Sequence, residues 1–247
     1  MKFALAVPLF TLLLASALAQ ELRPSDAKNL IVYQEQGRFA GWPANHGIWS
    51  WGDEILVGFE RGYFRDNDSG HDIDYSRPAE HVLTRSLDGG RNWNFQSYMG
   101  PEPLDYSIMP SSVRLSAASI VTAVRRRNWI DVYRSNDNGD SWSLLNQAAT
   151  DIGGNPPSMV QMPDGRLLMT YGYRKEPYGI HARVSENEGL TWSEPILLRE
   201  DGGGSDLGYT RTVVRPDGRL VTVYYYNTDA ARERFIAATI WDLNSVR

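Results

Sequence analysis

The side chains best suited to chemistry in this sequence lie in short polar segments that border β-prone runs. Glu60 and Arg61 end one such run, Asp72 and Asp74 lie in the loop that follows it, and Tyr209 precedes another run. The other candidates are Arg126, Arg174, Arg211 and His46. Arginine binds carboxylates through paired N–H donors, and carboxyl, imidazole and phenol groups transfer protons or act as nucleophiles. This combination favours a binding site for an anionic sugar.

Composition excludes several classes of function. The 247 residues carry 25 basic and 30 acidic side chains, a formal net charge of −5, which argues against a nucleic-acid partner. Cysteine is absent, so thiol catalysis and cysteine-bound metal clusters are excluded. The four histidines lie far apart, and the aspartates around Asp72 lack the spacing of a calcium-binding loop. We therefore expect neither a metal nor a cofactor.

The first 19 residues are typical of an export signal. Lys2 precedes an apolar run, and Ala17-Leu18-Ala19 has the pattern of small residues that signal peptidase cleaves. We predict cleavage near Ala19, a single domain over residues 20–247, and a secreted or periplasmic location. No later apolar run reaches the roughly 20 residues that cross a bilayer, so we expect no membrane span. The oligomeric state is left open.

The elements that must position the candidate residues are revealed by an internal repeat. SLDGGRNW at residues 86–93 aligns with SNDNGDSW at 135–142 and SENEGLTW at 185–192. A second marker, PDGRL, occurs at Pro163 and again at Pro216. Together the two markers define four units of roughly 50 residues, a period typical of repeat architectures.

Each unit contains four β-prone runs separated by turn residues, and helical periodicity is nearly absent. This order predicts an all-β propeller whose four-stranded units are blades. The last unit lacks its fourth run, and residues 30–35 form a single β-prone run before the first unit. We therefore predict that residues 30–35 pair with residues 235–243 and close the last blade, so that neither edge is left exposed.

The repeated segments match the Asp box, S-x-D-x-G-x-(T/N/S)-W, and the chain resembles the sialidase-type β-propellers built from BNR repeats. Asn187 replaces the aspartate in the third box. We expect the boxes to be structural, since Ser, Asp and Gly form a tight turn and the Trp packs between sheets. The family usually has six blades, whereas about four are visible in this sequence.

Strand polarity separates the boxes from the candidate site. If the boxes join the third and fourth strands of each blade, the loops between the second and third strands lie on the opposite face. The segments that lead into the innermost strands share that face. We expect the candidate residues to gather there, because the loops of all blades meet around the central axis.

The resemblance also implies catalytic roles. Sialidases of this family use a tyrosine nucleophile paired with a glutamate, an aspartate acid/base, and three arginines that bind the substrate carboxylate. By position in the repeats, Tyr209 in GYTRTV resembles the nucleophile, Glu60 in LVGFERG resembles its partner, and Asp72 or Asp74 lies in the region of the acid/base. The segment expected to supply the first arginine reads Gly41-Trp42-Pro43 and contains none. The arginines left as candidates for substrate binding are Arg61, Arg126, Arg174 and Arg211.

Three functions follow from these observations. The first is a secreted, sialidase-like exo-glycosidase that acts on an acidic or deoxy sugar of a glycan or acidic oligosaccharide. The second is a propeller rhamnosidase or polysaccharide lyase centred on His46, which the missing arginine favours. The third is a non-catalytic glycan-binding or truncated propeller, because a propeller fold by itself does not determine function.

Overall fold

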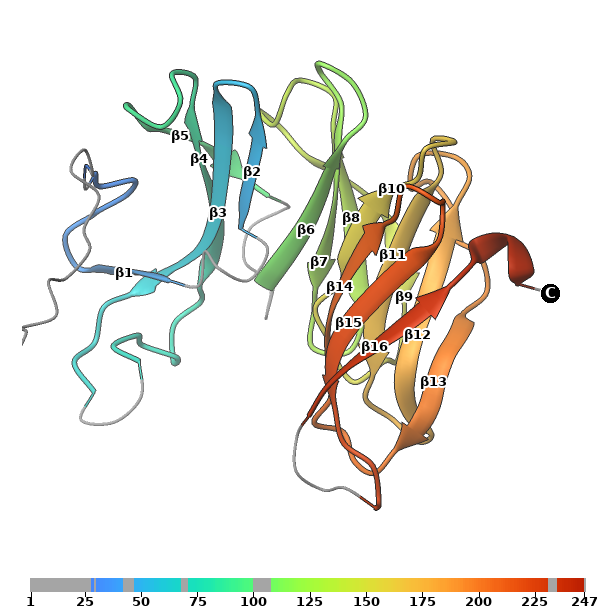
Figure 1. Ribbon diagram of the computed structural model, residues 1–247. Coiled ribbons are helices and arrows are strands. Elements are labelled where there is room, and N and C mark those ends of the chain that lie inside the picture. Colours follow the sequence, from blue (N-terminus) through green and yellow to red (C-terminus); the bar gives the residue numbers. More distant parts are fainter. Residues whose placement is uncertain are drawn as a thin grey trace, which may run out of the picture. The chain divides into compact units, whose positions relative to one another are not determined.

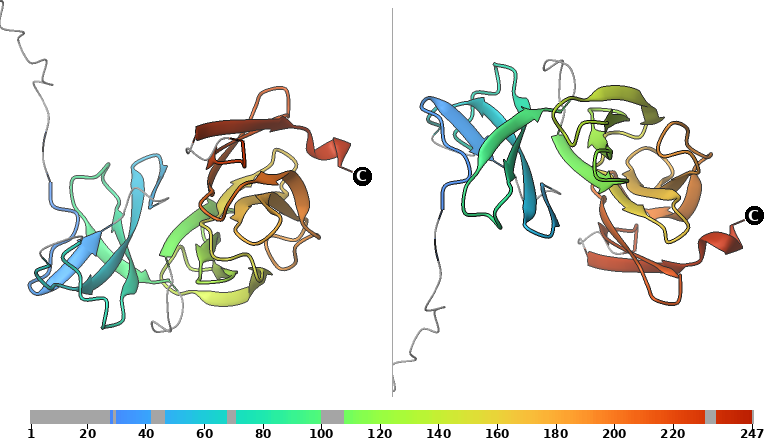
Figure 2. Two further views of the ribbon diagram at one scale, coloured as in Figure 1. Left: turned by 90° about the horizontal axis from the view of Figure 1, so that it is seen from below. Right: turned by 90° about the horizontal axis from the view of Figure 1, so that it is seen from above.

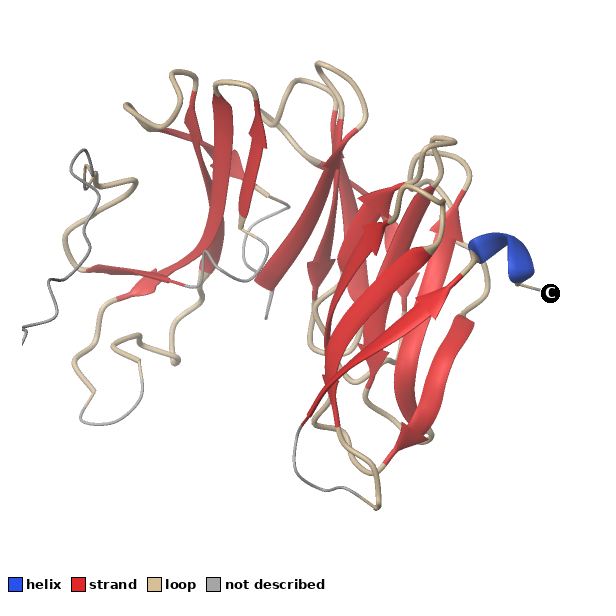
Figure 3. Cartoon of the chain, viewed as in Figure 1, coloured by secondary structure: helices blue, strands red, loops and turns tan. Residues whose placement is uncertain are grey.

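The computed structural model describes residues 28, 30–41, 47–67, 71–99, 108–230 and 235–246. The chain divides into two units, Met1–Leu30 and Ile31–Arg247, and every described strand belongs to the second. Apart from loops and turns, the described residues form strands and one short 3-10 helix, η1 (Leu243–Ser245), as Figure 3 shows. None of the described helical structure is long and apolar enough to cross a membrane. The expected all-β class is confirmed.

The strands form four antiparallel sheets in chain order, and each sheet is one blade (Figures 1 and 2). Blade 1 contains β1 (Arg38–Gly41), β2 (Ile48–Trp51), β3 (Glu54–Tyr63), β4 (Glu80–Ser86) and β5 (Asn94–Tyr98). Blade 2 contains β6 (Ile108–Arg114), β7 (Ile120–Arg125), β8 (Ile130–Ser135) and β9 (Ser143–Ala149). Blade 3 contains β10 (Ser158–Gln161), β11 (Leu167–Tyr173), β12 (Tyr178–Ser185) and β13 (Ile196–Gly202). Blade 4 contains β14 (Gly208–Val214), β15 (Leu220–Tyr226) and β16 (Phe235–Trp241), so the predicted four-bladed propeller is confirmed.

Blade 1 departs from the others at its first strand position. β2 pairs with the first half of β3, from Ile48 opposite Val57, and β1 pairs with the second half, from Gly41 opposite Glu60. The two short strands therefore occupy the place that a single strand fills in blades 2 and 3. When β1 and β2 are counted as one strand position, blades 1, 2 and 3 each have four strand positions, and blade 4 has three among the described residues.

The Asp boxes form the turns between the third and fourth strands of blades 1, 2 and 3. In the second box, Ser135 Oγ accepts a hydrogen bond from the Gly139 N–H at 2.7 Å, and Asp137 Oδ1 accepts one from the N–H four residues later at 2.9 Å. Gly139 has a φ of 90°, which favours glycine. In the third box, the Asn187 side-chain oxygen accepts the Thr191 N–H at 2.9 Å. An amide thus replaces the carboxylate as acceptor, and all of these bonds stay within the turn, as expected for a structural box.

The box tryptophans occupy equivalent positions but are less buried than the pattern predicts. Trp93, Trp142 and Trp192 are each half-buried. The Trp93 indole N–H donates to the Gly90 carbonyl at 2.9 Å, and the Trp142 indole N–H donates to Ser97 Oγ at 3.2 Å. Each ring therefore covers the edge of its own box turn or of the neighbouring blade.

The apolar core lies between consecutive blades. Val121 and Val132 of blade 2 pack in one cluster with Met169 and Tyr171 of blade 3. A second cluster joins blades 3 and 4 through residues such as Leu168, Ala182, Leu220 and Trp241. Because both faces of β7 and β11 are covered, these strands are buried along nearly their whole length. Burial between neighbouring blades thus stabilises blades 2, 3 and 4.

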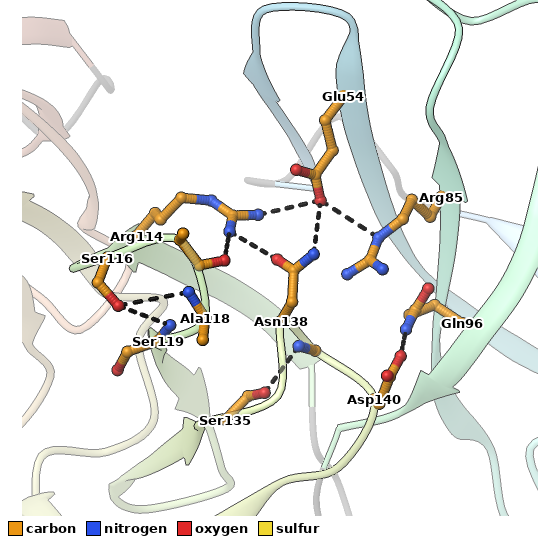
Figure 4. Close-up of polar contacts among 12 residues, drawn as sticks. Glu54, Arg85, Gln96, Arg114, Ser116, Ala118, Ser119, Ser135, Asn138 and Asp140 are labelled. Carbon is orange, nitrogen blue, oxygen red and sulfur yellow. Dashed lines mark hydrogen bonds and ion pairs between the residues drawn. The ribbon is translucent and has the colours of Figure 1, made fainter.

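The junction of blades 1 and 2 is polar at the box end of the strands. Glu54 of β3 forms ion pairs with Arg85 at 3.3 Å and with Arg114 of β6 at 3.1 Å, and Asn138 of the second box adjoins the same carboxylate (Figure 4). Half-buried charges are stabilised when they are paired and hydrogen-bonded in this way. The cluster therefore fixes the orientation of the two blades at the end remote from the candidate residues.

The predicted closure of the last blade is not formed. Residues 30–35 contain no strand, and among the described residues β16 pairs only with β15. Val32 and Tyr33 instead pack on blade 1, where the Tyr33 and Phe59 rings have centroids 4.9 Å apart. The prediction was wrong because a β-prone run specifies an extended conformation but not its partner, and the apolar face of β3 is closer in sequence.

Candidate active site

The register of each blade places the boxes and the candidate residues at opposite ends of the strands. In blade 2, Ser135 of the box pairs with Ile120 at the start of β7, whereas Arg125 ends β7 at the far end of the sheet. The corresponding register in blades 1 and 4 places Glu60 and Tyr209 at the end that Arg125 occupies. Their roles stay predictions, but they share the end of the blades that strand polarity indicates.

Tyr209 has an unusual backbone conformation. It lies at a β-bulge where β14 begins, with φ of 49°, next to Gly208 with φ of 110°. Met109 occupies the equivalent bulge of blade 2, with φ of 55°. A positive φ is disfavoured for bulky residues, and such strained positions cluster at functional sites. The bulge shifts the pairing register of β14 with β15 between Gly208 and Arg211.

Side chains from three blades meet at Tyr209. Arg125 of blade 2 donates a hydrogen bond from Nη1 to the Tyr209 hydroxyl at 3.3 Å. The Arg174 guanidinium, at the end of β11, lies 5.6 Å from the centroid of the Tyr209 ring. The Tyr225 ring of blade 4 lies at the same centroid distance of 5.6 Å from the Tyr209 ring. Tyr209 is 37% exposed, so its phenol is accessible to a ligand, whereas Arg125 is buried behind it with 8% exposure.

The second arginine and second tyrosine of this group are held by further bonds. Arg174 Nε donates to the Leu207 carbonyl at 3.1 Å, and its Nη2 donates to the Tyr225 hydroxyl at 2.8 Å. The Tyr225 hydroxyl donates to Asp206 Oδ1 at 2.7 Å. Burial, reinforced by the Asp206 carboxylate, raises the pKa of Tyr225 to about 12, so this phenol stays protonated and serves as a hydrogen-bond donor.

Glu60 and His81 form a second group at the same end, in blade 1. They are direct cross-strand partners on β3 and β4, so their side chains lie on the same face of the sheet. Burial raises the pKa of Glu60 to about 7. His81 is 7% exposed, and neither ring nitrogen has a hydrogen-bond partner among the described residues. Burial, together with the nearby Arg126, lowers the pKa of His81 to about 3. A neutral imidazole and a carboxyl that titrates near neutral pH therefore adjoin each other.

Arg61 is held in an ion-pair cluster on the other face of blade 1. It bonds to Glu80 through Nε at 2.7 Å, to Glu35 through Nη1 at 3.0 Å and to the Tyr98 hydroxyl through Nη2 at 2.8 Å. Arg38 bonds to the same Glu80 carboxylate at 2.6 Å. These contacts fasten the N-terminal segment to blade 1 and occupy the donors of Arg61.

The two aspartates of the β3–β4 loop have different surroundings. Asp72 is exposed and its Oδ1 accepts the Asn67 N–H at 3.2 Å. Asp74 Oδ1 accepts both the Ser76 hydroxyl at 2.6 Å and the Ser76 N–H at 3.0 Å, and these bonds lower the pKa of Asp74. Asp74 therefore stabilises a turn, and Asp72 is the more available carboxylate of the pair.

The remaining predicted residues are dispersed. Arg126 forms an ion pair with the buried Asp131 at 3.2 Å and lies 5.6 Å from the centroid of the Trp129 ring. Arg211 is exposed on β14, two residues after Tyr209. His46 lies outside the described residues, so its placement stays a prediction.

Three residues near Tyr209 were not singled out from the sequence as site residues, namely Arg125, Tyr225 and Asn155. Arg125 belongs to a run of three arginines, and the repeat alignment could have singled it out, because it aligns with Tyr225 at the end of the second strand of its blade. Asn155 is fully buried, and its Oδ1 accepts the Tyr209 N–H at 3.1 Å. Its segment was expected on this face because it leads into an innermost strand, but no sequence signal assigns Asn155 a role there.

One groove in the described part of the chain lies away from these residues. Within the described residues, no group of three or more His, Cys, Asp or Glu side chains could hold a metal ion. A groove of about 700 Å³ runs along β13 and η1, with Ile196, Leu198 and Trp241 among its lining residues. None of the predicted site residues lines this groove.

The sequence matches one protein family over most of its length. The BNR repeat-like domain family matches residues 69–222, which include all three Asp boxes and more than half of the chain. No curated protein matches the chain.

Several solved structures share the fold. The chain is similar to a protein of unknown function from Dyadobacter fermentans, with 24% identity and a TM-score of 0.62 over 81% of this chain and 53% of that one. It is similar to the Hadza microbial sialidase Hz136, with 16% identity and a TM-score of 0.54 over 81% of this chain and 37% of that one. It is also similar to the GH93 α-L-arabinofuranosidase of Fusarium graminearum, with 16% identity and a TM-score of 0.50 over 75% and 57% of the two chains. The chain thus spans from about a third to somewhat more than half of the length of these proteins, and the likeness shows the fold.

Proposed function

Because the chain belongs to the BNR repeat-like domain family, we propose that it is a sialidase-like glycoside hydrolase that removes an acidic sugar from the end of a glycan. The observation that carries the proposal is the surroundings of Tyr209. Its hydroxyl is bonded to Arg125, its ring adjoins Arg174 and Tyr225, and its φ of 49° holds it in a strained conformation. Strain at an exposed phenol flanked by two cations is typical of a functional site.

In this proposal Tyr209 is the nucleophile. Its oxygen attacks the anomeric carbon, its proton passes to Glu60, and the departing glycan oxygen takes a proton from Asp72. Asp72 then takes a proton from water as the water oxygen attacks the anomeric carbon, the bond from that carbon to Tyr209 breaks, and Glu60 returns its proton to the tyrosine oxygen. The pKa of about 7 at Glu60 supports its role, because a carboxyl that titrates near neutral pH exchanges protons readily there.

The proposed substrate class follows from the arginines. A guanidinium has five N–H donors in a planar fork, which matches the two oxygens of a sugar carboxylate. Arg174 uses Nε for Leu207 and Nη2 for Tyr225, so within the described residues its other donors are available to a ligand. We assign Arg174 to the carboxylate and Arg125 to the charge that develops on the Tyr209 oxygen. With export after cleavage near Ala19, the substrate would be an extracellular or periplasmic glycan.

One observation favours the glycan-binding alternative. Among the described residues, the hydrogen-bond partner of the Tyr209 hydroxyl is Arg125, and no carboxylate bonds to it. A tyrosine and two arginines without an adjacent base can bind an acidic sugar without cleaving it.

A product screen distinguishes the two functions. The purified chain is incubated with aryl glycosides of sialic acid, glucuronic acid, arabinofuranose and rhamnose, and the released aglycone and sugar are measured. We expect release from an acidic glycoside, and a loss of kcat/KM of at least about 100-fold in Tyr209→Phe with an unchanged Tm. Binding of the acidic sugar without release would favour the glycan-binding alternative, and release from rhamnosides alone would favour the enzyme centred on His46.

A further inference from the structure

We propose that Asn155 is the positioning residue for Tyr209, because its side-chain amide fixes the bend of the backbone that carries the tyrosine. Its effect on catalysis rests on the proposed function, whereas the positioning itself rests only on the backbone contacts. Asn155 lies in blade 3, just before β10, and Tyr209 lies at the start of β14 in blade 4.

The Asn155 amide bonds to three backbone groups of two blades. Its Oδ1 accepts the N–H of Gly172 and the N–H of Tyr209, each at 3.1 Å, and its Nδ2 donates to the Leu207 carbonyl at 3.0 Å. The side chain is fully buried, with 0% exposure. Two donors on one side and one acceptor on the other are matched by the oxygen and NH₂ of an amide.

These bonds surround the strained peptide. The Leu207 carbonyl and the Tyr209 N–H lie on either side of Gly208, and Gly208 and Tyr209 have φ of 110° and 49°. A positive φ at a tyrosine persists only where its surroundings determine it. Asn155 is the side chain that bonds to the backbone on both sides of this bend.

The fit between the amide and the backbone depends on glycine. A Cβ on Gly208 would lie 2.5 Å from Asn155 Nδ2, and a Cβ on Gly172 would lie 2.9 Å from Asn155 Cγ. Real Cβ atoms do not approach other atoms this closely, so only glycine allows the two strands to close on the amide. Asn155 and the two glycines, Gly172 and Gly208, are therefore the residue types that this set of contacts requires.

The same contact also orients Arg174. The Leu207 carbonyl that accepts from Asn155 accepts from Arg174 Nε as well, at 3.1 Å. The conformation of Tyr209 and the direction of Arg174 are therefore fixed at one carbonyl group. A loss of Asn155 should disturb the alignment of nucleophile and arginine without removing either side chain.

The test compares Asn155→Leu with Asn155→Asp and with the control Asn146→Leu. Leucine has the shape of asparagine but bonds to none of the three groups. Asn146 is matched to Asn155, since its Nδ2 crosses from blade 2 to blade 3 and donates to the carbonyls of Gly189 and Leu190 at 2.8 and 2.9 Å. It lies at the box end of the blades and does not contact Tyr209.

Amide hydrogen exchange of the full chain measures positioning without any assay of activity. We expect Asn155→Leu to accelerate exchange at Tyr209 and Gly172 at least 10-fold relative to amides of β8, and Asn146→Leu to leave both rates within 2-fold of wild type. Wild-type exchange at Tyr209 and Gly172 in Asn155→Leu would overturn the proposal. This readout holds even if the chain hydrolyses nothing, in which case only the proposed function fails.

Kinetics on the acidic glycoside measure the catalytic consequence. We expect Asn155→Leu to lower kcat at least 10-fold with KM changed less than 3-fold. In Asn155→Asp, the protonated carboxyl accepts the two N–H groups and donates to Leu207 as the amide does, and burial raises the pKa of such a carboxyl. Its kcat relative to wild type should therefore rise as the pH falls. A ratio that is flat with pH in Asn155→Asp would overturn the positioning role, and this variant decides the question if Asn155→Leu does not fold.

Discussion

The guanidinium of Arg125 on β7 donates a hydrogen bond to the hydroxyl of Tyr209 on β14, with 3.3 Å between Nη1 and the oxygen. The same Nη1 lies 3.5 Å from the sulfur of Met109, the residue that occupies the equivalent bulge in blade 2. One arginine thus connects the two strained positions of blades 2 and 4. Since the strands that carry them are far apart in the sequence, the site depends on the packing of the intervening blade.

We predict that Arg125→Met lowers kcat/KM on an acidic glycoside by at least about 10-fold, because it removes the cation beside the Tyr209 oxygen and keeps the apolar stem. The matched control is Arg126→Met, which breaks the ion pair with the buried Asp131. That control should lower the Tm, because it leaves a buried carboxylate unpaired, but kcat/KM of the folded fraction should stay within 3-fold. Equal kinetic losses in the two variants would show that Arg125 acts through stability alone.

Glu60 should make the stability of the protein depend on pH. Burial raises its pKa from 4.5 to about 7, so the folded state binds the proton more tightly than the unfolded state, and stability falls as the pH rises through this window. Glu60→Gln should therefore match wild type below pH 4.5 and exceed it above pH 7, by at most about 3 kcal/mol. Urea unfolding of both proteins at pH 4, 6 and 8 measures the difference. An advantage of the variant that is constant with pH would contradict the assignment.

The buried serine of each Asp box should contribute to the free energy of unfolding through its hydrogen bond to the turn. Ser135 is fully buried, and its Oγ accepts the Gly139 N–H at 2.7 Å. Ser135→Ala leaves that N–H buried without a partner, which should cost about 1–3 kcal/mol of unfolding free energy. Ser143→Ala, at an exposed position of β9, should change it by less than about 0.5 kcal/mol. Thermal unfolding followed by circular dichroism compares the two, and similar losses would mean that the box is not a rigid turn.

The N-terminal segment should stabilise blade 1 rather than blade 4. The Tyr33 ring packs on Phe59 at a centroid distance of 4.9 Å, and the Tyr33 hydroxyl accepts a hydrogen bond from Arg61 at 3.3 Å. We expect Tyr33→Ala to lower the unfolding free energy by about 1–2 kcal/mol, and Tyr75→Ala, whose ring is 70% exposed, to have little effect. Hydrogen exchange in Tyr33→Ala should be faster in β3 and β4. Faster exchange confined to β16 would contradict this placement and support pairing of the N-terminal segment with the last blade.

The fold could be predicted from the sequence because each blade is encoded locally. A box such as residues 135–142 contains the serine acceptor, the aspartate acceptor and the glycine of its own turn, so one segment specifies both a turn and the two strands beside it. The partner of residues 30–35 could not be predicted in this way. No tight turn joins those residues to a partner strand and fixes a register. They pack on the apolar face of β3, and their own sequence pattern does not predict that partner.

The candidate site could be predicted only in part. Strand polarity correctly placed Glu60 and Tyr209 at the end of the blades away from the boxes. The neighbours of Tyr209 depend on strand register between blades, and a shift of one residue decides that Arg125 rather than Arg126 reaches the tyrosine. Asn155 was missed for the same reason, since its bonds are all made to the backbone of residues that sequence proximity does not reveal.

The most direct test of the account is to trap the intermediate on Tyr209. The chain is incubated with a fluorinated acidic glycosyl fluoride, in which the fluorine beside the anomeric carbon slows release, and digested peptides are mapped by mass spectrometry. We predict one adduct, on Tyr209, that is absent from Tyr209→Phe and strongly reduced in Arg125→Met. An adduct on another residue, or turnover of the acidic glycoside by Tyr209→Phe at the wild-type rate, would contradict it.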